Sequence, residues 1–419
     1  MDERYSRLRG FLDLYGDDVF LFNLIEDTFI KYTKAYGFEE IKLPILERTE
    51  LFVRSIGEGS DIVAKEMFSF EDKGGRKVTM RPEGTAGVVR AILENNLFSN
   101  PKYHKVYYIG PMFRAERPQA GRLRQFHQIG VEWFGSDSVI VDFETISLLW
   151  NILLDLKISP KVDLVINSVG CDECVHKYKD DLKVFFDKNY ENFCKDCKTR
   201  REKNVLRIFD CKNHSCQNIL KEAPKITDKL CKNCVTHLES LENWLSKASI
   251  PFLVDPHLVR GLDYYTRNVF EVRYRGIGAQ NAIAGGGRYN NLVSEFGGPN
   301  IPAFGFAMGV ERTILALKEN ITVPEELSVA VCSISPNEAE FSLKVASLIR
   351  SKGLKTHVLS YLDGIGKQMK TASKIGVKFA IIVGEDEVKE EKVTLKNMAT
   401  GEQKKLPLTS LAETILTNP

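Results

Sequence analysis

The stretch YYIGPMFRAERPQAGRLRQFHQIGVEWFG, from Tyr107 to Gly135, decides the fold. Two runs rich in aromatic and β-branched residues flank a polar loop, a pattern typical of a β-hairpin. Because alternate side chains of a strand share a face, Arg114 and Glu116 line up on the outgoing strand. The same rule groups four residues of the returning strand on one face, namely Phe126, Gln128, Gly130 and Glu132. One face therefore offers an arginine, two carboxylates, an amide and an aromatic ring.

These side chains are suited to a nucleotide. The planar guanidinium of arginine matches phosphate oxygens, and an aromatic face can stack on a purine base. Between the strands, Arg117, Arg122 and Arg124 lie on a loop that we expect at the surface. The alternative is a hairpin with a solvated polar face, since such faces are common in antiparallel sheets.

Three further segments carry candidate functional residues. In TMRPEGT (Thr79–Thr85), Arg81 and Glu83 flank a proline–glycine turn. LVRGLDYYTRNVFEV (Leu258–Val272) brings an arginine, an aspartate and two tyrosines to the start of a strand. The segment Ala284–Leu317 joins a triple-glycine turn to a strand of small residues and a helix with Arg312. The glycines permit close backbone approach or a positive φ.

The order of elements predicts an α+β fold. A helical pattern runs from Asp17 to about Gly37, and Ile41 and Leu43 then alternate with polar residues up to Pro44, as in a short strand. Strand patterns follow at Lys77–Met80, His104–Glu116, Gln125–Trp133 and Asn268–Tyr274. One helix followed by many strands favours a core built on an antiparallel sheet with flanking helices.

Two regions depart from this core. Residues 167–250 are rich in Cys, Lys and Asp and predict a largely helical insertion, because strand patterns resume at Phe252. From residue 324 onward, short apolar strands alternate with helices, which predicts a small α/β domain. We therefore expect a core formed by residues 1–166 and 251–323, interrupted by the insertion and followed by a domain at 324–419.

Composition places the chain among ordinary globular proteins. Of its 419 residues, 43% are hydrophobic and 27% charged, and the formal net charge is only +2. The near balance leaves no global basic field, although basic residues are concentrated in the Arg117–Arg124 loop and in the insertion. No uncharged apolar run reaches the length of a membrane span, and the N-terminus does not resemble a secretion signal. We expect a cytoplasmic protein without a membrane partner.

Eight of the nine cysteines fall within the predicted insertion. They form three Cys-x2-Cys pairs and one Cys-x4-Cys pair: Cys171/Cys174, Cys194/Cys197, Cys231/Cys234 and Cys211/Cys216. Paired thiolates at this spacing suit tetrahedral Zn²⁺, so eight could form two four-cysteine structural sites. Which pairs share a site is left open, and reduced packing thiols are the alternative.

Taken together, the segments resemble class II aminoacyl-tRNA synthetases, and specifically the histidyl-tRNA synthetase family, over almost the whole chain. RPEGT, the span from Arg114 to Glu132 and the helix arginine Arg312 are similar to the class II core. RGLDYYTRNVFEV and AGGGRY are similar to the two motifs particular to the histidine enzymes. The resemblance implies a C-terminal anticodon-binding domain, a homodimer, and ATP with Mg²⁺, L-histidine and histidine tRNA as substrates.

The resemblance also implies residue roles. It assigns catalysis to Arg260, Arg114 and Arg312, and ATP binding to Arg114, Glu116, Phe126 and Arg312. It assigns histidine binding to Glu83, Gly84, Thr85, Gln128, Glu132, Tyr264 and Tyr265. Within the loop, Arg117, Gln119, Arg122 and Arg124 are expected to meet the tRNA acceptor end.

The implied activity is ATP-dependent attachment of histidine to its tRNA through a histidyl-adenylate. One alternative is a catalytically silent regulatory subunit of histidine biosynthesis that shares this core. Such subunits lack the anticodon-binding domain and usually lose the histidine-specific residues, whereas Arg260, Tyr264 and Tyr265 are present here. A second alternative is an RNA-binding protein that keeps the fold without the activity.

Overall fold

The computed structural model describes residues 3–417 apart from 58, 59, 61, 120, 212, 277–280 and 320. The chain divides into two compact units, Met1–Thr322 and Val323–Pro419. None of the helices in this described part combines the length and apolar composition needed to cross a membrane.

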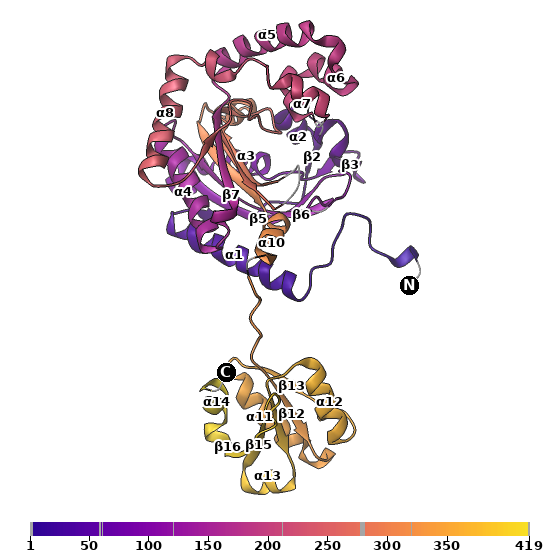
Figure 1. Cartoon of the computed structure of the whole chain (residues 1–419). Helices are drawn as coiled ribbons and strands as arrows, with labels where there is room; N and C mark the ends of the chain where they lie inside the picture. The colour runs from indigo at the N-terminus through magenta and orange to yellow at the C-terminus, as the bar shows by residue number, and fades with distance from the viewer. Residues whose placement is uncertain are drawn as a thin grey trace. The chain divides into compact units, whose positions relative to one another are not determined.

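An eight-stranded sheet forms the centre of the first unit (Figure 1). Neighbouring strands pair antiparallel except at the two edges, where β1 is parallel to β5 and β8 is parallel to β7. In sheet order the strands are β1 (Glu39–Glu40), β5 (Lys105–Phe113), β6 (Gln125–Phe134), β11 (Ala303–Gly309), β10 (Ala282–Arg288), β9 (Thr266–Tyr274), β7 (Val162–Ser168) and β8 (Leu253–Val254). The predicted α+β fold with an antiparallel sheet is confirmed.

Helices pack against this sheet. α1 (Asp17–Ala35) contacts both α4 (Val139–Asp155) and α10 (Val310–Lys318). Apolar residues three and four apart give α4 a buried face, and the Ser138 hydroxyl accepts the Ile140 N–H at its start. A second core joins α3 (Thr85–Glu94) to β5. Beside α3 lie α2 (Thr49–Ile56), α9 (Leu292–Glu295) and a small sheet of β2 (Leu46–Arg48), β4 (Lys77–Met80) and β3 (Phe68–Glu71).

The insertion is helical, as predicted. Four helices follow β7: α5 (Asp172–Lys188), α6 (Lys195–Lys203), α7 (His214–Leu220) and α8 (Lys232–Lys247). Figure 1 shows α5, α6 and α7 gathered at one end of this unit, while α8 runs back along α4. A short 3-10 helix, η7 (Val205–Asp210), lies between α6 and α7 and packs into a core with Tyr178, Leu182 and Cys216.

The second unit is a small α/β domain. Its sheet has the order β13 (Lys355–Val358), β12 (Ser328–Ser333), β14 (Phe379–Val383), β15 (Lys392–Asn397) and β16 (Gln403–Pro407). The first three strands are parallel, and the last two add antiparallel pairings, so the sheet is mixed. The helices are α11 (Ala339–Arg350), α12 (Ile365–Ile375), α13 (Glu385–Glu390) and α14 (Leu408–Thr417).

Two local predictions were wrong. The strand expected around Ile41 and Leu43 ends at Glu40, because after the Ile41 N–H donates to Tyr107 O at 2.9 Å the chain leaves the sheet. The expected triple-glycine turn is the middle of strand β10. A Cβ on Gly286 would lie 2.1 Å from the Gly305 carbonyl oxygen on β11, so the glycines serve close strand packing.

We predict that Gly286→Ala destabilises the first unit by about 1–3 kcal/mol, because the new methyl group would meet backbone rather than a movable side chain. Gly74→Ala is the matched control, since its Cβ would approach a flexible Asp72 side chain at 3.3 Å. Urea unfolding followed by circular dichroism measures both. Equal stabilities for the two variants would contradict the packing argument.

Candidate functional site

A cavity of about 730 Å³ lies against the large sheet. Phe126 and Gln128 of β6, Gly285 of β10 and Arg312 of α10 line it, together with Arg260 from the loop before β9. The insertion closes part of its wall through Phe209, Cys211 and Gln217. Segments far apart in the sequence therefore meet at one site.

Two arginines in this cavity are held by backbone carbonyl groups. Arg114 Nε donates to Pro82 O at 2.9 Å, and its guanidinium lies 5.3 Å from the centroid of the Phe126 ring. Arg312 Nε donates to Gly121 O at 2.8 Å and Nη1 to Ala282 O at 2.7 Å. Burial lowers the pKa of Arg312, and the nearby guanidiniums lower it further. Several positive charges thus converge, as an anionic ligand requires.

Arg260 lies flat on the glycine strand. Its Nη1 donates to Glu271 Oε1 at 2.5 Å, and a Cβ on Gly285 would lie 2.5 Å from the guanidinium. Glu271 also accepts from Arg273 Nε at 3.1 Å. The first glycine of the triple therefore gives Arg260 the room to reach into the cavity.

The two halves of the loop between β5 and β6 differ in their exposure to solvent. Arg117 and Gln119 are exposed. Arg122 turns inward and forms an ion pair with the buried carboxylate of Glu116. Arg124 is also drawn in, with its Nε donating to Glu116 O at 3.2 Å. The expectation that the whole loop lies at the surface is therefore wrong for its second half, where Arg122 is held by the buried Glu116 carboxylate and Arg124 by the Glu116 backbone carbonyl oxygen.

Next to the cavity, a buried carboxylate lies among hydroxyl groups. Thr85 Oγ1 donates to Glu132 Oε1 at 2.7 Å, and the Tyr289 hydroxyl donates to Oε2. Burial raises the pKa of Glu132 to about 8 despite these two donors. A Cβ on Gly305 would lie 1.9 Å from Glu132 Oε2, so glycine is required there too.

Tyrosine rings enclose this carboxylate. The Tyr264 ring centroid is 4.7 Å from that of Tyr265 and 5.6 Å from that of Tyr289. Tyr108 is also buried nearby, and a Cβ on Gly84 would lie 2.4 Å from its ring. The result is a buried acidic group surrounded by aromatic rings.

Glu83 and Gln128 are two further polar residues that could bind a ligand. Glu83 accepts the N–H groups of Thr85 and Ala86, at 2.6 and 2.9 Å, at the start of α3, and burial raises its pKa. Gln128 Oε1 is buried and accepts no hydrogen bond from any residue that the structure describes. A ligand ammonium group would satisfy such acceptors.

The large cavity brings together the proposed ATP-binding residues with Arg260 and Gln128. The other proposed histidine-binding residues do not line it: Tyr265 lines a second cavity, and Glu83, Gly84, Thr85, Glu132 and Tyr264 are buried. Sequence reasoning missed Tyr108, Tyr289 and Glu271. Tyr289 directly follows the glycine strand within AGGGRY, so the motif itself contained the signal. Glu271 and Tyr108 depend on pairing between distant strands, which no local pattern reports.

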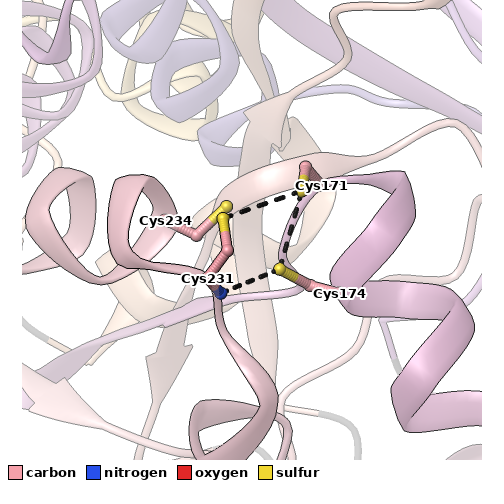
Figure 2. Close-up of side chains that lie close together, drawn as sticks. All are labelled: Cys171, Cys174, Cys231 and Cys234. Atoms are coloured by element: carbon pink, nitrogen blue, oxygen red, sulfur yellow. Dashed lines mark hydrogen bonds between the residues drawn. The ribbon is translucent and has the colours of Figure 1, made fainter.

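The eight insertion cysteines form two groups. Cys171, Cys174, Cys231 and Cys234 make one, shown in Figure 2, and Cys194, Cys197, Cys211 and Cys216 make the other. Within each group the sulfurs lie within 4.8 Å of one another. Separations such as 3.5 Å for Cys171–Cys174 and 3.7 Å for Cys194–Cys211 are too long for disulfides. They match the spacing of about 3.8 Å between sulfurs bound to tetrahedral Zn²⁺.

The helix N-termini favour the thiolate form at Cys194 and Cys231, whereas burial raises the pKa of Cys174, Cys197, Cys216 and Cys234. Cys171, Cys194 and Cys231 each stand immediately before a helix, and Cys174, Cys197 and Cys234 follow in the first turn. The Cys234 N–H lowers the pKa of Cys231 to about 7. Helix N-termini stabilise thiolates, which are the metal-binding form.

Two protein families match the chain. The family described as histidyl-tRNA synthetase matches residues 10–313, and the family described as anticodon binding domain matches residues 328–418. Among individual proteins, a histidine–tRNA ligase from Halothermothrix orenii is 48% identical over 409 residues, which cover 97% of each chain. One from Thermotoga petrophila is 47% identical and covers 95% of each.

A solved structure gives the same result. The apo histidyl-tRNA synthetase of S. aureus superposes with a TM-score of 0.80 at 34% identity, covering 98% of this chain and 99% of that one. The matches extend over both units and over the cavity residues described above. The chain belongs to the histidyl-tRNA synthetase family.

Proposed function

We propose that this chain charges histidine tRNA in two steps, as a histidine–tRNA ligase. L-Histidine first reacts with ATP to give histidyl-adenylate and pyrophosphate, and the histidyl group then passes to the tRNA. The observation that carries the proposal is the buried Glu132 carboxyl group, bonded to Thr85 and Tyr289, on the same strand as Phe126 and Gln128, which line a cavity rich in arginine. Family membership supports ATP with Mg²⁺, histidine and tRNA as the substrates.

The surroundings of Glu132 are suited to the imidazole ring. Glu132 offers a carboxyl group to one ring nitrogen, and the Tyr265 hydroxyl can pair with the other. Tyr289 holds the second oxygen of Glu132 and fixes its orientation. A site with buried polar partners rejects analogues that lack the matching groups, by about 10⁴-fold in favourable cases.

The ammonium group of histidine is assigned to three other polar residues. Glu83, Thr85 and Gln128 are the residues we propose, and the unpaired Gln128 oxygen supports this. Gly84 gives room for Tyr108 behind them, and Tyr264 packs between the tyrosines on either side. The carboxylate of histidine would then point towards Arg260.

ATP is assigned to the cavity, as its Mg²⁺ complex. Phe126 would stack on the adenine, and Arg114 and Arg312 would bind phosphate oxygens, with Glu116 holding the nucleotide through the inward-turned Arg122. These guanidiniums stay protonated at any working pH. The Mg²⁺ of the substrate complex neutralises charge on the leaving pyrophosphate.

Activation is an in-line displacement. A histidine carboxylate oxygen bonds to the α-phosphorus as the bond to the pyrophosphate oxygen breaks. Two anionic groups must approach, so positioning and charge neutralisation supply most of the catalysis. Arg260, held by Glu271, is the group we assign to the charge that gathers at the α-phosphate.

In the second step a terminal ribose hydroxyl of the tRNA attacks the carbonyl carbon of the adenylate, and AMP leaves. The exposed Arg117 and Gln119 are the first candidates for contact with the acceptor end, and Arg122 and Arg124 reach it only if the loop opens. The second unit, which matches the anticodon-binding family, is assigned to the anticodon.

The regulatory-subunit alternative is less well supported. Arg260, Tyr264 and Tyr265 all belong to the site, and the second unit is present. We further propose that the protein is a cytoplasmic homodimer. We also propose a catalytic core of residues 1–166 and 251–323, an insertion at 167–250 and an anticodon-binding domain at 324–419. Light scattering on the purified protein tests the dimer.

We also infer structural Zn²⁺ in both four-cysteine groups. The sulfur spacings and the helix N-termini support this assignment. The groups contribute to folding of the insertion, and no step of the reaction depends on metal chemistry there.

Histidine-dependent exchange of labelled pyrophosphate into ATP tests the function. We expect exchange with histidine and none with other amino acids, and Arg260→Ala should lower its rate by about 10²-fold or more, since one transition-state charge partner is lost. The dissociation constant of histidine, measured by calorimetry, should change far less. Absence of exchange in clean, folded wild-type protein would defeat the proposal.

Glu132→Gln tests the proposed histidine site in a second way. Because the folded-state pKa of Glu132 is about 8, the folded protein holds a proton that the unfolded chain releases above about pH 4.3. Stability therefore falls as pH rises towards about pH 8, and Gln abolishes this dependence. We expect the wild-type melting temperature to decline relative to that of the variant, while the histidine KM of the variant rises about tenfold. If the melting temperatures of wild type and variant changed with pH in the same way, the raised pKa of the buried Glu132 would be contradicted.

Metal analysis tests the cysteine groups. Protein purified without added zinc should contain about two equivalents per chain, and Cys171→Ser or Cys194→Ser should each remove about one. Cys332→Ser, outside both groups, is the matched control and should retain both. Fewer than one equivalent in the wild type would exclude the assignment.

A further inference from the structure

Side chains of the insertion hydrogen-bond to the loop that carries Arg260. From η7, Arg207 Nη2 donates to Asp263 Oδ1 at 2.6 Å, and Nη1 donates to the carbonyl oxygen of Arg260 at 3.4 Å. Asn204 Nδ2 donates to the same Asp263 oxygen at 3.1 Å. One guanidinium of the insertion therefore holds the loop at two points, one of them the backbone of the proposed catalytic arginine.

This contact is buried on the Arg207 side and partly exposed on the Asp263 side. The Arg207 side chain is 8% exposed and that of Asp263 28%. On the other side of Asp263 lies Gly57, whose φ of +91° suits glycine and whose Cβ would lie 2.5 Å from Asp263 Oδ2. Because the Arg207 charge is largely buried, it depends strongly on a charged partner, so loss of the Asp263 carboxylate should weaken the contact that holds the loop.

Packing alone does not hold the loop. A second cavity of about 280 Å³ lies behind it, lined by Lys179 and Arg207 of the insertion and by Asp263 and Tyr265 of the loop. Arg260 lines both this cavity and the large one. Leu258, Leu262 and Tyr264 pack the loop into the hydrophobic core. Beside the second cavity, the polar contacts of Arg207 and Asn204 with Asp263 add to this packing.

η7 is itself fixed at both ends. The Asn204 side chain accepts the Leu206 N–H at 3.2 Å at its start. At its end, Cys211 belongs to the second cysteine group, with its sulfur 3.7 Å from that of Cys194. Arg207 thus lies on a short 3-10 helix whose two ends are both held by side-chain contacts.

We propose that Arg207 is a positioning residue for histidine activation, which sets the place of Arg260 over the reacting phosphate through Asp263 and the Arg260 backbone. The insertion is then part of the machinery of the first step, before any tRNA is bound. This inference rests on the proposed ligase activity. It does not depend on which metal, if any, the cysteines hold.

Pyrophosphate exchange by full-length Arg207→Ala protein tests the inference. We expect kcat to fall about 10- to 100-fold, because a displacement of about 1 Å in a reacting group costs this much. The KM for ATP should stay within about threefold, because Arg114 and Arg312 are held by other backbone groups. Arg201→Ala, which removes a partly exposed insertion arginine paired with Asp187, is the matched control and should keep wild-type kcat.

Asp263→Asn provides a second variant that changes charge without volume, and it should reproduce the loss in kcat. In the double variant the losses should not multiply, since both changes break one contact. The inference would be overturned if Arg207→Ala kept a kcat within threefold of wild type, or if the losses in kcat multiplied in the double variant. A change in the KM for ATP as large as the change in kcat would overturn it as well. Wild-type protein without exchange would instead defeat the proposed function, so the two failures are distinguishable.

Discussion

The burial of one carboxyl group, Glu132, is the constraint on which the rest of the site depends. Removing a carboxylate from water is costly, which is why burial raises the pKa of Glu132 to about 8. The fold compensates with hydroxyl donors from Thr85 and Tyr289. It also needs the close approach of β11, and Gly305 provides it. A neutral or partly neutral acid among tyrosine rings is suited to a small heteroaromatic ring with two nitrogens, and less suited to an aliphatic side chain.

The adjoining cavity has the opposite character. Arg114 and Arg312 are both oriented by carbonyl oxygens, and Arg114 also lies 3.7 Å from Glu116 Oε1. Arg260 differs because it is paired with Glu271 and anchored through its loop to the insertion. Preorganised charge of this kind stabilises a phosphoryl transition state without reorganisation during the reaction. We propose that histidine binds near the buried Glu132 and that the nucleotide binds in the basic cavity.

Much of this site could be predicted from the sequence, because the β5–β6 hairpin carries its own signal. Alternation along β6 correctly grouped Phe126 with Glu132, and the family motifs supplied Arg260. What could not be predicted depends on contacts between distant segments. A triple glycine permits a turn or a crowded strand, and only the neighbouring Gly305 carbonyl decides between them. The inward turn of Arg122 and the contact of Arg207 with Asp263 likewise depend on carboxylates of other segments, which periodicity does not locate.

The account's central claim is that Glu132 recognises histidine beside a nucleotide bound at the arginine cavity. A crystal structure with L-histidine and a non-hydrolysable ATP analogue measures this most directly. The account predicts an imidazole nitrogen within about 3 Å of a Glu132 oxygen, with the α-phosphate facing Arg260. An imidazole bound away from Glu132, or an α-phosphate out of reach of Arg260, would contradict it.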